Sequence, residues 1–164
     1  EHGVEVLTRV VDYGGLFHGD MKRGHEFKPG DHRAYRPKGW VEAGHDRIEK
    51  MAGVIDRHEM DLLHFACLWN LSQAPVKSVV PTFIQEAGES ARSIESKIEE
   101  FGRLPDIEFT AAEVEEIMAA GDNTGCMKLK GASHRHEKSE RPDEWPMRPE
   151  LLELAGRHGL GTEW

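Results

Sequence analysis

Two short segments rich in β-branched residues, separated by a helical stretch, constrain the fold of this 164-residue chain more than any other feature. The first covers residues 3–11 and the second covers residues 76–81, and glycine or proline bounds each of them. Their apolar character is typical of strands that are buried on both faces of a parallel sheet. The order of strand, long connection, helices and strand predicts a βαβ unit in which the two strands run parallel.

Apolar residues spaced by three and four predict helices between and after these strands. We expect helices at residues 41–57, 61–72, 91–101, 110–120 and 149–158. The second of them begins at Asp61, a favourable N-cap residue, and its wide apolar face predicts deep packing. The fourth begins with Thr110 and carries Glu113 three residues later, which is the sequence of a capping box. Residues 17–38 are rich in charge, histidine, proline and glycine, and predict a long loop.

Charge and hydropathy exclude several classes of protein. The chain carries 21 basic and 30 acidic side chains, a formal charge of −9, so we expect no nucleic-acid partner. No apolar run approaches the ~18 residues of a membrane span, so we expect no membrane partner. The first residues lack the pattern of a signal peptide, and Cys67 and Cys126 form neither a disulfide framework nor a zinc site. The default expectation is a reducing, cytoplasmic location.

Histidine and acidic residues offer weak candidates for chemistry. His134 and His136 lack a cysteine or carboxylate cluster at ligand spacing and lie among basic residues, so we expect no metal site. Asp12 and Tyr13 follow the first strand, at the end where parallel α/β folds place their sites. A role in acid–base chemistry and a role in anchoring the loop are both open for this pair, and anchoring is favoured. We interpret His64 as a structural residue beside an apolar helix face.

The loops that follow the two strands are both candidate anion sites. Gly14 and Gly15 begin the first loop, and a glycine pair either exposes backbone N–H groups to a phosphate or simply permits a tight turn. The second loop follows Pro81 and leads to a helix expected to start close to Arg92. A helix N-terminus with a guanidinium beside it favours a phosphate. Because the two candidates lie at neighbouring strand ends, each one supports the other.

These same segments resemble the aldo/keto reductase family. Residues 62–71 (LLHFACLWNL) followed by residues 75–81 (PVKSVVP) are similar to the family's late barrel helix and eighth strand. Residues 14–19 (GGLFHG) resemble its glycine turn after the seventh strand, and the helix from Ala91 resembles its eighth helix. The resemblance covers roughly residues 3–101, with three elements in the family's order.

The resemblance implies that this α/β chain is the C-terminal part of a (β/α)₈ TIM barrel, with two barrel strands, several helices and a C-terminal extension. Residues 1–105 would form the last βα units of the barrel. Residues 106–164 would form C-terminal helices and an extension, and Trp145 and Trp164 are aromatic candidates for a flap over the substrate. The family's catalytic residues would precede Glu1, so this chain would hold none of them and would need the N-terminal barrel portion as its partner.

The function implied by the resemblance is that of an NADP(H)-dependent oxidoreductase that reduces aldehydes or ketones to alcohols. Six residues are implied to bind the cofactor: Gly14, Gly15 and Leu16 at the pyrophosphate, and Pro81, Thr82 and Arg92 at the adenosine 2′-phosphate. Whether the chain belongs to an active enzyme is open. The alternative is a non-catalytic nucleotide-binding or regulatory module derived from the same barrel.

Overall fold

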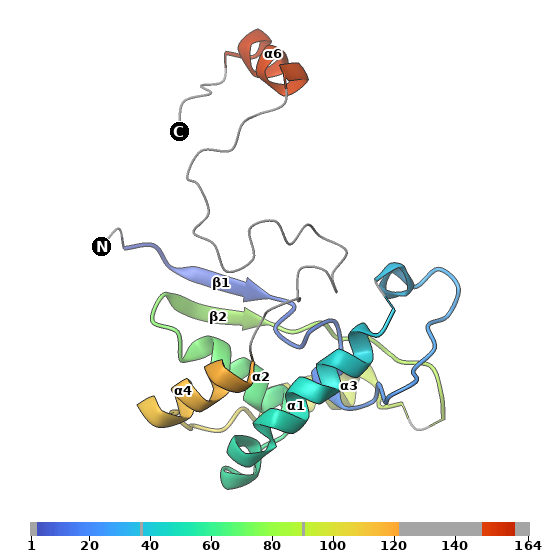
Figure 1. Cartoon of the computed structure of the whole chain (residues 1–164), viewed down its shortest axis with the longest axis vertical. Helices are drawn as coiled ribbons and strands as arrows, with labels where there is room; N and C mark the ends of the chain where they lie inside the picture. The colour runs from blue at the N-terminus through green and yellow to red at the C-terminus, as the bar shows by residue number, and fades with distance from the viewer. Residues whose placement is uncertain (1–2, 37, 90, 122–148, 160–164) are drawn as a thin grey trace.

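The computed structural model describes residues 3–36, 38–89, 91–121 and 149–159. Within these residues the sheet has two parallel strands, β1 (Val6–Arg9) and β2 (Val76–Val80). Figure 1 shows both strands side by side and pointing the same way. The connection between them contains helices α1 (Trp40–Arg57) and α2 (Leu62–Leu71). The predicted α/β fold with a βαβ unit is confirmed. A pair of parallel strands occurs in many α/β folds, so the (β/α)₈ barrel stays a proposal.

The remaining elements follow the sequence prediction closely. Helices α3 (Ile94–Phe101), α4 (Ala111–Ala120) and α6 (Pro149–Arg157) come after β2. The long loop after β1 contains two 3₁₀ turns, η1 (Leu16–His18) and η2 (His32–Tyr35). Helix α3 begins three residues later than predicted because the Ser93 hydroxyl accepts the Ser96 N–H and caps the helix there. None of the helices described is long and apolar enough to cross a membrane.

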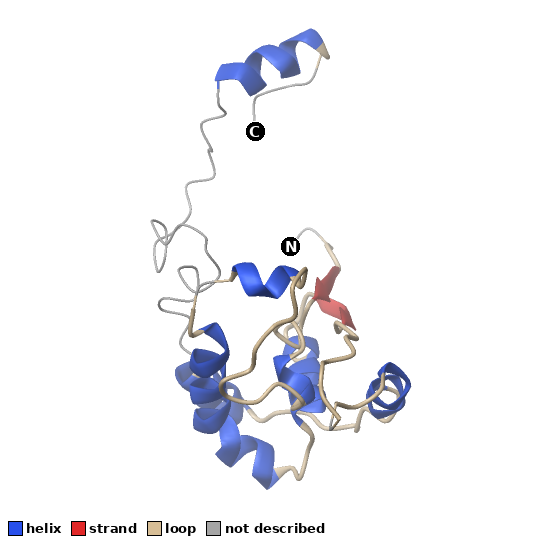
Figure 2. Ribbon diagram, turned by 90° about the vertical axis from the view of Figure 1, so that its right-hand side faces the viewer, coloured by secondary structure: helices blue, strands red, loops and turns tan. Residues whose placement is uncertain are grey.

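Helices cover one side of the sheet. Leu63 and Cys67 of α2 are fully buried and pack against Val76 and Val79 of β2. Figure 1 shows α1, α2 and α4 on the same side of the strands, and Figure 2 gives the view turned by 90°. Burial raises the pKa of the Cys67 thiol to about 12, which agrees with its interpretation as an inert core residue.

The expectation that both faces of the strands are buried is wrong. Leu7 pairs with Ser78 and Arg9 pairs with Val80, and all four side chains are exposed. The exposed fraction is 57% for Leu7 and 43% for Val80. Successive residues of a strand point to opposite faces, and a register shift after the Val6–Val76 pair brings Val76 and Val79 to the same face. The described helices cover only this face.

Helix α4 joins the core formed by α1 and α2. Its Ile117 is 3% exposed and lies in one cluster with Val54 of α1 and Phe65 of α2. The predicted capping box is present, since the Thr110 N–H donates to Glu113 Oε2 and the Glu113 N–H donates to Thr110 Oγ1. Apolar spacing also predicts Met118 on the buried face, but this side chain is 63% exposed because Ile117 makes the contact instead.

Candidate functional site at the carboxyl ends of the strands

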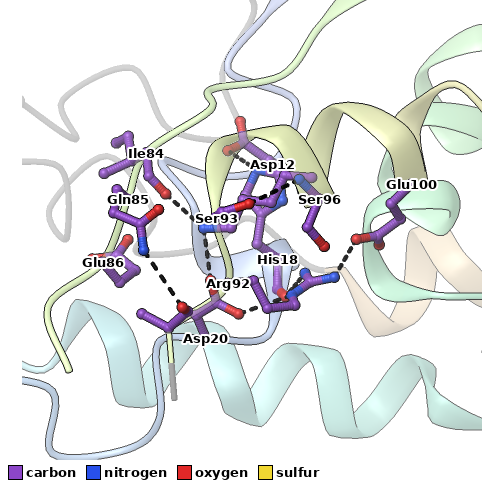
Figure 3. A network of polar contacts seen from close by, with 12 residues as sticks. Asp12, His18, Asp20, Ile84, Gln85, Glu86, Arg92, Ser93, Ser96 and Glu100 are labelled. Atoms are coloured by element: carbon purple, nitrogen blue, oxygen red, sulfur yellow. Dashed lines mark hydrogen bonds and ion pairs between the residues drawn. The ribbon is translucent and has the colours of Figure 1, made fainter. Parts of the chain in front are cut away.

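Asp12 connects the loops that follow β1 and β2. The Thr82 N–H donates to Asp12 Oδ1 at 2.9 Å, and His18 Nε2 lies 2.9 Å from the Thr82 carbonyl oxygen and 3.3 Å from Asp12 Oδ2 (Figure 3). Asp12 and His18 are both buried. A proton on Nε2 would serve both acceptors. Of the two roles left open for Asp12, the structure shows the anchoring of the loop.

Asp20 joins the first loop to α3 and to the segment that leads into it. Arg92 Nε donates to Asp20 Oδ1 at 3.0 Å, and Lys97 Nζ lies 2.7 Å from Asp20 Oδ2 and 2.6 Å from the Ile84 carbonyl oxygen (Figure 3). Lys97 is completely buried. Burial by itself would raise the pKa of Asp20, but the hydrogen bonds from Lys97 and Arg92 outweigh it and hold that pKa below its usual value.

Arg33 forms a second buried ionic group behind the glycine turn. Its side chain is 2% exposed and binds two carboxylates, Asp31 through Nε and Nη2 and Glu86 through Nη1 and Nη2. Arg33 Nη1 also donates to the Gly14 carbonyl oxygen at 3.0 Å. Hydrogen bonding from Arg33 lowers the pKa of Asp31 to about 2. The loop that carries Arg33 is therefore fastened both to the turn after β1 and to the loop after β2.

The glycine pair accommodates arginine side chains. Gly14 and Gly15 have φ angles of 72° and 98°, which disfavour other residues. A Cβ on Gly14 would lie 2.9 Å from Arg36 Nη2, and a Cβ on Gly15 would lie 3.2 Å from Arg33 Nη1. The glycines are thus needed for the turn and for the close approach of two guanidinium groups to its backbone.

Leu16 anchors this turn to α1. Its side chain is completely buried in a cluster with Met21, Trp40 and Ile48. It also lies directly over Gly44 of α1, where an added Cβ would come within 2.2 Å of Leu16 Cδ2. The Leu16 side chain is therefore not placed to contact a ligand.

The structure brings the six predicted cofactor residues to one edge of the sheet. Gly14, Gly15, Leu16 and Pro81 are buried, whereas Thr82 and Arg92 are partly exposed. All three guanidinium nitrogens of Arg92 already have acceptors: Asp20 for Nε, Glu100 for Nη1 and the His18 carbonyl for Nη2. Arg92 also precedes α3, so it is not in the first turn of that helix. In this arrangement Arg92 links the loops, and it would have to leave an acceptor to bind a phosphate.

Sequence patterns do not reveal the buried charges that hold the site together, which are Asp20, Arg33, Glu86 and Lys97. Charged side chains in loops and short helices are usually solvated, and the same is expected of Arg36, which is partly buried. One signal is present for the Arg33 group: Asp31 stands two residues before Arg33 and accepts its N–H, the pattern of an Asx turn.

A separate cavity of about 620 Å³ lies between the end of β1, α1, α2 and α4. Tyr13, Phe17, Phe65 and Trp69 line it together with Arg9 and other residues. None of the six predicted cofactor residues is in its lining.

Metal binding finds no support in the part of the chain that the structure describes, where no group of three or more His, Cys, Asp or Glu side chains is arranged to hold an ion. His134, His136, Cys126, Trp145 and Trp164 lie outside the described residues. His64, interpreted as structural, is 8% exposed and its Nε2 lies 2.7 Å from the Glu100 carbonyl oxygen.

Comparisons of the chain with protein families, with curated proteins and with solved structures found no match.

Proposed function

We propose that this chain supplies part of the NADP(H) site of an oxidoreductase that reduces aldehydes or ketones to alcohols. In this proposal the chain forms the last βα units of a (β/α)₈ barrel of the aldo/keto reductase type. The observation that carries the proposal is the hydrogen bond from the Thr82 N–H to Asp12 Oδ1. It joins two loops that lie about 70 residues apart in the chain and that were both expected, from local chemistry, to bind phosphate. Parallel α/β folds place their ligands at this edge of the sheet.

The residues at this edge fit a dinucleotide phosphate on the side of the glycine turn. Gly14 and Gly15 carry no side chain, and a left-handed residue followed by a right-handed turn is a backbone arrangement that binds anions. A bound NADPH would supply the hydride that the reaction transfers. The residues of this chain would hold the phosphates and fix the two loops, while the groups that act on the carbonyl would come from other strands.

The exposed face of the sheet supports the barrel in this proposal. Leu7 and Val80 are large apolar residues on a face that no described helix covers. Within the described residues β1 pairs only with β2, so its other edge is free to take another strand. We assign this edge to the N-terminal barrel portion, which would bring the catalytic residues.

Titration of the chain with NADPH tests the proposal, with quenching of tryptophan fluorescence as the readout. The test variant is Gly15→Ala, because φ of 98° and the nearby Arg33 both oppose a Cβ at this position. The control is Gly53→Ala in α1, where an added Cβ meets only ordinary contacts and favours the helix. We expect NADPH to bind the original chain and the control equally, and Gly15→Ala about tenfold or more weakly.

A chain that binds no NADPH would contradict this function. If the complete natural protein binds NADPH but reduces no carbonyl compound, the result would favour the alternative of a non-catalytic nucleotide-binding module.

A further inference from the structure

Arg36 is a charged residue at this edge whose hydrogen bonding is incomplete. It caps the C-terminal end of η2, three residues after Arg33. Every nitrogen of the Arg33 guanidinium donates to a carboxylate or a carbonyl. Arg36 Nη1, in contrast, is buried and has no hydrogen-bond partner among the residues the structure describes. Buried guanidinium groups in native proteins are normally paired, so the position indicates a missing acceptor.

Two aromatic rings and the glycine turn fix the Arg36 guanidinium. Its Cζ lies 4.3 Å from the centre of the Trp40 ring and 5.8 Å from that of Tyr13. Trp40 is 3% exposed, so the stacking surface is rigid. Nη2 also lies 2.9 Å from the point where Gly14 would carry a Cβ. The guanidinium is therefore held close to the turn predicted to bind phosphate.

The nearby carboxylates do not accept a hydrogen bond from Arg36 Nη1. Asp31 binds Arg33, and Asp12 accepts from the Thr82 N–H and contacts His18. The charge of Arg33 opposes that of Arg36, and burial is the main cause that lowers the pKa of Arg36. An anion that approaches Gly14 from outside would relieve both effects.

We propose that Arg36 is an anion-binding residue that takes a phosphoryl oxyanion beside Gly14, through the planar donors of a guanidinium stacked on Trp40. A guanidinium matches two phosphate oxygens at once, and the absence of a side chain on Gly14 lets the Arg36 guanidinium lie against the turn. Arg36 is a cation with a nitrogen available for such a ligand, whereas each nitrogen of the Arg92 guanidinium already has an acceptor. That the phosphate belongs to a dinucleotide rests on the proposed function; a free phosphate would use the same chemistry.

The experiment measures binding of inorganic pyrophosphate and of NADPH to the full chain by calorimetry, with chloride at matched ionic strength as the blank. The variants are Arg36→Gln, Arg36→Lys and the control Arg103→Gln, which alters a side chain 76% exposed on the surface. We expect Arg36→Gln to weaken pyrophosphate about 10- to 100-fold, Arg36→Lys to weaken it less, and Arg103→Gln to leave it unchanged. Circular dichroism and thermal unfolding check that each variant folds. If Arg36→Gln does not fold, the affinity of Arg36→Lys for pyrophosphate provides the test.

The outcomes separate this inference from the proposed function. Loss of both ligands in Arg36→Gln supports the site with a dinucleotide as the source. Loss of pyrophosphate binding in a chain that never binds NADPH supports the site with a free phosphate and removes the proposed function. Equal pyrophosphate affinity in all variants, or no pyrophosphate binding by the original chain, overturns the role of Arg36, whether or not NADPH binds.

Discussion

The carboxyl edge of the sheet and the exposed face of the same sheet differ in how fully their side chains are paired or buried. At the edge, Arg33, Glu86, Asp20 and Lys97 are buried charges in direct contact with opposite charges. On the face, Leu7 and other apolar side chains lie exposed beside a strand with a free edge. The edge is thus held together within the chain, whereas the face has the properties of a surface that another element covers.

The two regions differ in whether their contacts are made within the described residues. Ion pairs at the edge join loops that are distant in the sequence, so contacts within the chain stabilise the loop geometry. Apolar surface left on a sheet is favourable only after burial, at about 25 cal/mol per Å². Substitutions at the edge should therefore destabilise the chain more than substitutions on the exposed face.

The largest effect is expected for Arg33→Met, which leaves the buried Glu86 carboxylate without its principal partner. Removal of one partner of a buried ion pair costs about 3–5 kcal/mol. Urea unfolding followed by circular dichroism measures the change, and the control is Arg103→Met, which removes an exposed pair. A loss below about 1 kcal/mol would show that the edge is not held by this group.

A smaller, pH-dependent effect is expected for Asp20→Asn. The hydrogen bonds from Lys97 and Arg92 hold the folded pKa of Asp20 below its unfolded value. Its contribution to stability is therefore present above the unfolded pKa of about 3.9 and is lost as the pH falls through the folded pKa. We expect a loss of about 2 kcal/mol at neutral pH. Unfolding curves at several pH values should show the difference from the original chain shrinking below about pH 4, and a difference that grows instead would contradict the arrangement.

Arg92→Gln distinguishes a linking arginine from a phosphate-binding one. Its side chain is 36% exposed and all its nitrogens have acceptors, so we expect a loss of about 1 kcal/mol in stability. NADPH and NADH affinities should change by the same factor, as measured by fluorescence titration. A selective loss of NADPH would instead place Arg92 at the 2′-phosphate and show that it exchanges its acceptors when the cofactor binds.

The smallest effect on stability is expected for Leu7→Thr on the exposed face. The side chain is 57% exposed, so the free energy of unfolding of the chain should change by less than about 0.5 kcal/mol. Val79→Thr on the covered face is the comparison, with an expected loss of about 1–2 kcal/mol for a polar group placed in the core. A large loss of stability in Leu7→Thr would mean that the face is already covered within the chain.

The helices and strands were predictable because their signals are local. Apolar spacing fixed α1 and α2 to within a residue or two, and the Thr110–Glu113 pair identified the start of α4. The start of α3 was misplaced because the capping serine, Ser93, followed other small residues that looked equally suitable. Burial of the strands was overestimated because β-branched residues mark a strand but not which of its faces is covered.

The candidate site was predictable only in outline. Glycines and strand ends located the two loops, since these depend on backbone conformation and topology. The contacts that join them, such as Lys97 with Asp20, connect residues 77 positions apart in pairs that leave no pattern in a single sequence. Arg92 looked available because a guanidinium near a helix start suggests an anion, and its three acceptors appear only in the folded chain.

The contact between Leu16 and Gly44 has a mechanical consequence. Because α1 has no side chain at this position, the turn that carries Gly14 and Gly15 rests against the helix backbone itself. Contact with the helix backbone therefore limits how closely the turn can approach α1. Any residue larger than glycine at position 44 would push Leu16 outward and change the depth of the turn without touching a ligand. A substitution at position 44 would therefore change the geometry of the loop indirectly, through Leu16. It would alter the affinity of the turn for an anion without contacting that anion.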